Sequence, residues 1–196
     1  MKFSRRLLKY LLLTLLAVYA LLWLLSIPTH KQILGVSFRP EYADSLGLDW
    51  KKTYSAIITD LKPHSIRIAA EWANIEPVKG KYEFSDLDWM IKQAEENNVK
   101  IILALGQKTP RWPECHNPEW VRPMSQAARG QFFDYVKEVV TRYRSSNAVE
   151  IWQVENEPFI EFVFGQCADL HPEWVEDEIA MVKSLDPSRR IVVTDS

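Results

Sequence analysis

Strand-like apolar runs and helical patterns alternate from residue 33 to the last residue of the chain. The strand-like runs begin near residues 33, 64, 99, 149 and 190, and helical periodicity follows each of the first four. Successive starts lie 31, 35, 50 and 41 residues apart, as expected of βα units with longer third and fourth loops. This alternation predicts an α/β fold with a parallel sheet, either doubly wound or closed as a barrel.

The loop after the first strand favours the barrel. Residues 38–49 contain neither Gly-x-Gly-x-x-Gly nor Gly-Lys-Ser/Thr, so the turn that cradles a phosphate is absent. A whole barrel takes roughly 250 residues, whereas residues 33–196 supply about four βα units and a fifth strand. We therefore expect the N-terminal part of a TIM (β/α)8 barrel. Its open first and fifth strands would be covered by further units, or by self-association of the half-barrel.

Capping residues and apolar spacing predict the first two helices. Asp49 is expected to cap a helix that stops at Pro63 and turns one face inward, formed by Trp50, Tyr54, Ile57, Ile58 and Leu61. Ser85 is expected to cap the second helix, with Phe84 and Trp89 as its hydrophobic staple.

The third and fourth helices follow from the same signals. The third is predicted over residues 125–144, and its inward positions are Phe132, Val136, Val139, Val140 and Tyr143. The fourth begins at Pro172, which suits the first position of a helix, and ends at Leu185.

An uninterrupted apolar segment precedes the barrel pattern. Residues 10–27 carry no charge, and as a helix they span roughly 27 Å, close to the hydrocarbon thickness of a bilayer. Four basic residues precede the segment and only Lys31 follows it closely, so the positive-inside rule places residues 1–9 in the cytoplasm. We expect a single-pass membrane protein with a signal anchor at 10–27, a linker at 28–32 and an extracytoplasmic barrel at 33–196.

A cleaved signal peptide is the alternative to an anchor. The apolar run exceeds the usual length of about 7–15 residues, and Ser26-Ile27-Pro28-Thr29 makes a poor cleavage site.

Charge and cysteine content restrict the partners. The chain has 24 basic and 26 acidic side chains, and four of the basic ones lie in the first nine residues. The barrel is therefore acidic, and no nucleic-acid partner is expected. The spacing of the two cysteines suits no metal site, and we expect no metal or cofactor.

Polar and aromatic side chains gather where three predicted strands end. The second strand runs from Arg67 to Glu71 and Trp72, the third leads into residues 107–116, and the fourth ends in Glu155-Asn156-Glu157-Pro158. In a barrel these carboxyl ends form the functional rim. Carboxylates, an amide, an arginine and indoles at one rim are what a sugar site requires.

Three motifs make the resemblance specific. Residues 152–158 (Trp-Gln-Val-Glu-Asn-Glu-Pro) on the fourth strand, Arg67 on the second, and residues 76–84 (Glu-Pro-Val-Lys-Gly-Lys-Tyr-Glu-Phe) resemble the retaining β-glycosidases of clan A. The resemblance covers roughly residues 33–196 and is nearest to glycoside hydrolase family 5, the cellulase-like family. Families 10, 39 and 42 share much of it.

The resemblance implies a role for each motif residue. Glu157 matches the acid/base that protonates the leaving sugar, and Asn156 matches the residue that binds the 2-hydroxyl. Arg67 matches the arginine that keeps the nucleophile ionised. The nucleophile of this clan is a glutamate that ends the seventh strand, beyond Ser196, so residues 1–196 alone are expected to be an inactive part of an O-glycosyl hydrolase.

Each of these residues also has a structural interpretation. Glu157 could cap the next segment, Asn156 could form a turn, and Arg67 could pair with Glu155 or Glu71 inside the barrel. Trp72, Trp112, Trp120 and Trp152 are candidate sugar platforms that could equally be packing residues. His116 is a candidate substrate ligand, displaced from the position of the family's histidine near the third strand.

Two functions remain open at this point. The first is a membrane-anchored glycosidase acting on a β-linked glycan of unspecified identity. The second is a non-catalytic carbohydrate-binding or envelope-structural protein that keeps the aromatic residues without both carboxylates.

The two cysteines lie in the loops after the third and fourth strands, which are neighbours on one rim in a barrel. In an oxidising compartment we expect Cys115 and Cys167 to form a disulfide that stabilises the fold by roughly 3–4 kcal/mol.

The anchor interpretation predicts where the chain is found. The full-length chain should fractionate with membranes and be digested by protease from the outer side, because no polar face interrupts residues 10–27. A mature soluble form beginning near residues 28–31 would contradict the anchor.

Overall fold

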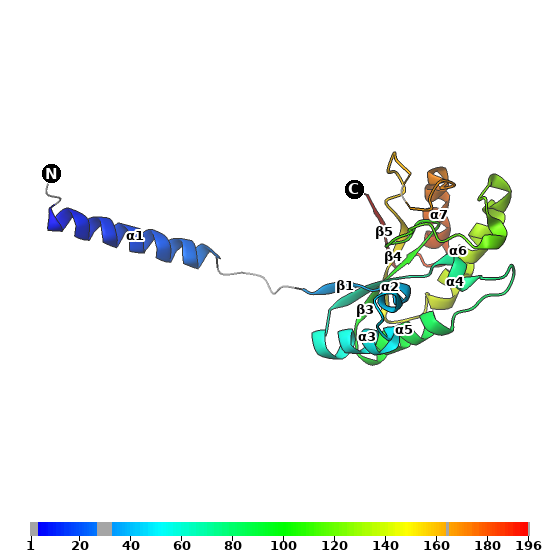
Figure 1. Cartoon of the computed structure of the whole chain (residues 1–196), viewed down its shortest axis with the longest axis horizontal. Coiled ribbons are helices and arrows are strands. Elements are labelled where there is room, and N and C mark those ends of the chain that lie inside the picture. The colour runs from blue at the N-terminus through cyan, green and yellow to red at the C-terminus, as the bar shows by residue number, and fades with distance from the viewer. Residues whose placement is uncertain (1–3, 27–32, 164, 196) are drawn as a thin grey trace. The chain divides into compact units, whose positions relative to one another are not determined.

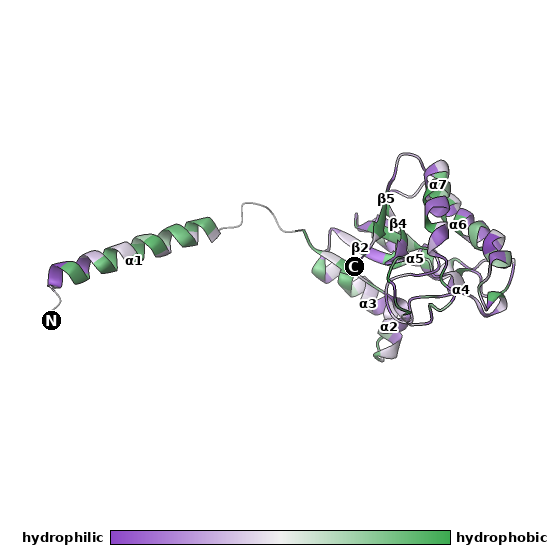
Figure 2. Ribbon diagram, turned by 90° about the horizontal axis from the view of Figure 1, so that it is seen from above, coloured by the Kyte–Doolittle hydropathy of each residue, from purple (hydrophilic) through white to green (hydrophobic). Residues whose placement is uncertain are grey.

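The computed structural model describes residues 4–26, 33–163 and 165–195, which fall into two compact units, residues 1–33 and 34–196. In the first unit, α1 (Arg5–Ser26) is a single helix with a mostly apolar surface (Figure 2). It is long and apolar enough to cross a membrane, a property that signal sequences share. The predicted linker at 28–32 lies outside the described residues.

The second unit is built on a parallel sheet of five strands (Figure 1). These are β1 (Gly35–Ser37), β2 (Ser65–Ala69), β3 (Lys100–Leu105), β4 (Val149–Asn156) and β5 (Arg190–Thr194). The strands pair in the order β1-β2-β3-β4-β5. A doubly wound sheet would reverse its strand order at a switch point. The sequential order among the described strands is that of a barrel wall, and the predicted α/β fold with a parallel sheet is confirmed.

Helices connect successive strands. They are α2 (Pro40–Ser45), α3 (Trp50–Ala56), α4 (Trp72–Ile75), α5 (Ser85–Glu96), α6 (Arg129–Tyr143) and α7 (Val175–Leu185). A π-helical turn, Ile57–Leu61, extends α3, and short 3-10 turns lie at Glu119–Val121, Gln126–Ala128 and Pro172–Trp174. The long helices α3, α5, α6 and α7 are the crossovers between parallel strands.

The alternation of side chains along β2 determines which of them point toward the helices and which point into the barrel. On β2, Ile66 and Ile68 are fully buried, whereas Arg67 between them is partly exposed. Successive strand residues point to opposite faces. The isoleucines therefore belong to the core under the helices, and Arg67 points to the opposite face, the interior of the barrel wall.

An aromatic cluster fills much of the core. Phe132 and Tyr135 of α6 are fully buried and contact the ring of Trp72, with centroid separations of 5.5 Å in both cases. All five inward positions predicted for this helix are buried, and Tyr135 joins them.

Two local predictions are wrong. Leu61 is 55% exposed, because the π-helical turn changes the angular phase of the apolar face after Ala56. Ser85 does not cap α5 but is its first residue, and the Glu83 carboxylate accepts the Ser85 N–H at 3.1 Å. Asp49 does cap α3, accepting the Lys52 N–H at 3.0 Å.

The predicted staple of α5 is also replaced by other ring contacts. Phe84 packs on Tyr143 of α6, with ring centroids 6.0 Å apart. Trp89 packs on Trp50 of α3, with centroids 5.4 Å apart.

Adjacent phenylalanines of α6 test the core. Phe132→Ala should lower the free energy of unfolding by about 3–5 kcal/mol, because the ring is fully buried and leaves a cavity. Phe133→Ala should cost clearly less, because that ring is only partly buried. Equal costs in denaturant unfolding would contradict this packing.

Candidate active site

The carboxyl end of β4 has an unusual backbone. Glu155 and Glu157 both have positive φ angles, 58° and 51°, with Asn156 between them. Non-glycine residues pay about 1–3 kcal/mol for such conformations and concentrate at functional sites. Backbone hydrogen bonds hold the turn from both sides: Asn156 N donates to Lys108 O at 2.8 Å, and Glu157 N donates to Thr194 O at 3.0 Å.

The Glu155 carboxylate anchors this turn to the loop after β3. It is 1% exposed and accepts the backbone N–H groups of Gln107 at 2.7 Å and Lys108 at 2.6 Å. Burial raises the pKa of Glu155, and the two backbone hydrogen bonds oppose that rise. Gly106 makes room for the carboxylate, since a Cβ there would lie 2.5 Å from it.

The Lys108 side chain supports Glu157 from the same loop. Its buried ammonium donates to the Glu157 carbonyl oxygen at 2.9 Å and pairs with Glu114 Oε2 at 3.2 Å. The backbone of Glu157 is thus held by β5 and by the loop after β3. No hydrogen bond joins its carboxyl group to another described residue.

Four of the residues predicted from the sequence line one cavity of about 550 Å³. Arg67 comes from β2, Trp112 from the loop after β3, and Asn156 and Glu157 from the end of β4. The remaining lining residues are Pro110, Arg111, Glu114 and Thr194. Trp112, a candidate sugar platform, is 64% exposed.

Arg67 forms no ion pair with the described residues. Its Nε donates to Ser37 Oγ at 3.0 Å and its Nη1 to Gln153 Oε1 at 3.4 Å. Burial and the neighbouring Arg111 lower the pKa of Arg67, and Glu157 opposes this effect. The suggested structural partners are engaged elsewhere, because Glu71 pairs with Arg39 and Glu155 binds backbone N–H groups.

The Asn156 amide is oriented by its oxygen. Oδ1 accepts from Gln153 Nε2 at 3.3 Å and from Thr194 Oγ1 at 3.2 Å. Within the described part of the chain no group accepts from its Nδ2, so the amide can donate to a ligand in the cavity.

Trp72 and Trp152 are not sugar platforms, and this prediction is wrong. Both indoles are fully buried. Their N–H groups donate to Glu76 Oε2 at 2.8 Å and to Asp186 Oδ2 at 3.0 Å, which explains how a polar indole tolerates the core. Trp120 is partly buried against Trp72.

His116 does not line the Glu157 cavity, and its role in substrate binding stays a prediction. The ring is buried, and Nδ1 lies 3.4 Å from Glu71 Oε2. Burial and the nearby Arg39 lower the pKa of His116 to about 4, so the ring is neutral near pH 7.

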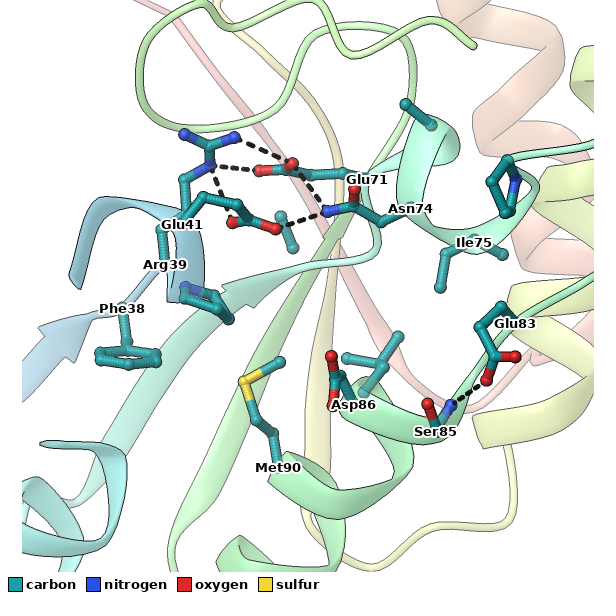
Figure 3. Close-up of a pocket in the computed structure, with 15 residues that line it drawn as sticks. Phe38, Arg39, Glu41, Glu71, Asn74, Ile75, Glu83, Ser85, Asp86 and Met90 are labelled. Atoms are coloured by element: carbon teal, nitrogen blue, oxygen red, sulfur yellow. Dashed lines mark hydrogen bonds and ion pairs between the residues drawn. The ribbon is translucent and has the colours of Figure 1, made fainter. Parts of the chain in front are cut away.

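Sequence reasoning missed a second cavity of about 300 Å³ beside the ends of β1 and β2 (Figure 3). Its polar side is an ion-pair cluster in which Arg39 Nε lies 2.5 Å from Glu71 Oε1 and Asn74 Nδ2 donates to Glu41 Oε1 at 2.6 Å. Arg39 directly follows the first predicted strand, and that rim position was the available signal.

The loops after β3 and β4 are joined covalently. Cys115 and Cys167 form a disulfide with a Cα separation of 5.1 Å. Gln166 N also donates to Pro113 O at 3.0 Å, and a Cβ at Gly165 would overlap that oxygen. The rim segment that carries Trp112 is therefore attached to the segment that follows Glu157.

A parallel barrel sheet whose fourth strand ends in Asn-Glu-Pro beside an arginine of the second strand defines a TIM-barrel glycoside hydrolase of clan A. The family model described as beta-galactosidase, that of glycoside hydrolase family 42, matches residues 48–188. The chain belongs to this family. Family 42 is one of the families that share the sequence motifs with family 5. The preference for family 5 itself is not confirmed.

The chain is also similar in sequence to relatives that differ in their named activities. Beta-galactosidase LacZ of Lactobacillus acidophilus is 26% identical over 65% of this chain and 22% of its own length. Mannan endo-1,4-beta-mannosidase F of Aspergillus clavatus is 29% identical over 54% of this chain and 25% of its own. The chain thus spans about a quarter of the length of these relatives.

Solved structures share the fold. Xylanase 10B from Thermotoga petrophila superposes with a TM-score of 0.61 at 19% identity, covering 86% of this chain and 54% of the xylanase. The exo-beta-1,4-mannosidase of Opitutaceae bacterium strain TAV5 gives a TM-score of 0.65 at 14% identity, covering 84% of this chain and 32% of the mannosidase.

Two glycines test the anchoring of the β4 end. Gly106→Ala should lower the free energy of unfolding by about 1–3 kcal/mol, because the residue has φ of 128° and the new methyl group would overlap the Glu155 carboxylate. Gly130→Ala, in α6 with open space around it, should be neutral or stabilising by up to about 1 kcal/mol. Similar effects of the two changes in urea unfolding would contradict the role of the Glu155 carboxylate in holding the end of β4.

Proposed function

We propose that this chain supplies the proton-donating half of a retaining β-glycosidase site. Glu157 is the acid/base, Asn156 donates to the sugar 2-hydroxyl, and Arg67 holds the nucleophilic carboxylate in its ionised form. The single observation that carries the proposal is that these three side chains, from two strands far apart in sequence, line one cavity.

The hydrogen bonding around Glu157 supports the role of acid/base. The protein fixes its backbone through Thr194 and Lys108 but leaves the carboxyl group without a hydrogen bond from the described residues. A general acid must reach the leaving oxygen at about 2.6–3.2 Å. A fixed backbone with an uncommitted carboxyl group meets that requirement.

The nucleophile is proposed to come from a strand outside the five described here. Retention requires a second carboxylate about 5–5.5 Å from the first. Glu71 and Glu155 are buried and already bonded to Arg39 and to backbone N–H groups. Arg67, which has no ion-pair partner among the described residues, is the group that such a carboxylate would meet.

A β-linked glycoside is the proposed substrate class. The family description is beta-galactosidase, and the matched relatives also include a mannan endo-1,4-beta-mannosidase. An aryl β-galactoside is therefore the first substrate to test, followed by the β-mannoside and β-xyloside. We further propose that residues 10–27 anchor the barrel to the outer side of a membrane, a placement that the four basic residues among residues 1–9 favour.

Glu157→Gln tests the assignment against a matched control. In a protein that carries the complete barrel, this change should slow hydrolysis of substrates with poor leaving groups by about 10²–10⁴-fold, because proton donation is lost. Glu161→Gln, an exposed carboxylate in the next loop, should leave the rates unchanged. Azide should partly restore turnover of activated substrates by the Glu157 variant, since an anion attacks the glycosyl-enzyme without a general base.

A complete barrel that binds β-glycosides but does not hydrolyse them would favour the non-catalytic alternative. Residues 1–196 alone should show no hydrolysis. Turnover by that chain, abolished by Glu157→Gln, would contradict an external nucleophile.

A further inference from the structure

A second buried glutamate lies behind the β4 end. Glu178 of α7 is fully buried, and neither of its oxygens receives a hydrogen bond from the N–H and O–H donors of the described residues. α7 packs against β4, and the electrostatic influence of each carboxyl group on the other places the Glu178 side chain beside that of Glu155, which is also buried. A hydrogen bond between two carboxyl groups requires a proton on one of them, since a carboxylate can only accept.

The charged and hydroxyl groups around the pair, among the described residues, are bonded to other partners. The Lys108 ammonium, from the loop after β3, is bonded to Glu114 and to the Glu157 carbonyl oxygen. The Tyr135 hydroxyl, from α6, donates to the Ala70 carbonyl oxygen. Glu71, the remaining carboxylate near Tyr135, is paired with Arg39.

We propose that Glu178 is a protonated carboxylic acid at neutral pH that donates its proton to the Glu155 carboxylate, and that this shared proton positions the strand end carrying Asn156 and Glu157. Glu155 is the ionised partner because two backbone N–H groups already donate to it. Glu178 is thus a positioning residue. Its importance for catalysis rests on the function proposed above. The protonation of Glu178 does not depend on that function.

The pair makes folding depend on pH in a defined direction. Burial raises the pKa of both groups, and that of Glu178 lies well above its ordinary value. In the unfolded chain both lose their protons near pH 4.3. Above that pH the folded state binds more protons than the unfolded state. Stability is therefore greatest at low pH with respect to this pair, and falls as pH rises through the folded-state pKa values.

The test compares two glutamines on one helix. Unfolding by urea is measured on the full chain in detergent at intervals between pH 5 and pH 8, for wild type, Glu178→Gln and Glu176→Gln. Each proton retained by the folded state should lower the wild-type folding constant by up to tenfold per pH unit. Glu178→Gln keeps a neutral donor and should remove one proton from this dependence. Glu176, exposed on the same helix, should behave as wild type when changed.

A spectroscopic signature reports the proton directly. With ¹³C-labelled glutamate carboxyl groups, wild type and Glu176→Gln should show a protonated carboxyl resonance at pH 7 that is absent from Glu178→Gln. Its absence from wild type, an unchanged pH slope in Glu178→Gln, or failure of that variant to fold would overturn the proposal. None of these results depends on hydrolysis, so the glycosidase assignment would stand or fall separately.

Discussion

Two short hydrogen bonds from the backbone of Gln107 and Lys108 to the Glu155 carboxylate fix the geometry of the rim. They connect the loop after β3 to the end of β4, and Gly106 is required for the close approach. The positive φ angles at Glu155 and Glu157 can persist because this connection, together with the bonds to Lys108 and Thr194, determines the backbone path. Asn156 and Glu157 lie on this fixed part of the backbone.

The acidic residues of the rim divide into two groups by their environment. Glu71 and Glu155 are buried. Glu71 is paired with Arg39, and Glu155 accepts hydrogen bonds from backbone N–H groups. Glu157 is partly exposed, and its carboxyl group receives no hydrogen bond from the described residues. Burial and bonding thus distinguish Glu71 and Glu155 from Glu157, the proposed acid/base.

Much of the barrel wall could be predicted from local pattern, because strands and crossover helices follow hydrophobic periodicity. The observed strands fall within two residues of the predicted starts, and Asp49 caps its helix as expected. Leu61 could not be predicted, since a π-helical turn changes the helical phase without a sequence signal. Ser85 was misassigned because the side chain of Glu83 bonds its N–H group.

The site was only partly predictable for a related reason. Arg67, Trp112, Asn156 and Glu157 line one cavity, as expected of polar and aromatic residues that lie on strands or in the loops that follow them. Trp72 begins α4 and Trp152 lies within β4, and both indoles are packed in the core. The burial of Glu178 could not be predicted from the sequence. Glu178 is one of several acidic residues of an amphipathic helix, and only the packing of α7 against β4 shows that it is buried.

The most direct test of the central claim is the position of a bound sugar. A crystal structure of the complete barrel with a sulfur-linked β-disaccharide, which resists hydrolysis, would locate both catalytic contacts at once. The account predicts that the Glu157 carboxyl group lies within hydrogen-bonding reach of the linking sulfur and that the Asn156 amide donates to the 2-hydroxyl of the same sugar. A disaccharide seated in the cavity beside Arg39 and Glu71, with Glu157 out of reach of the linkage, would contradict it.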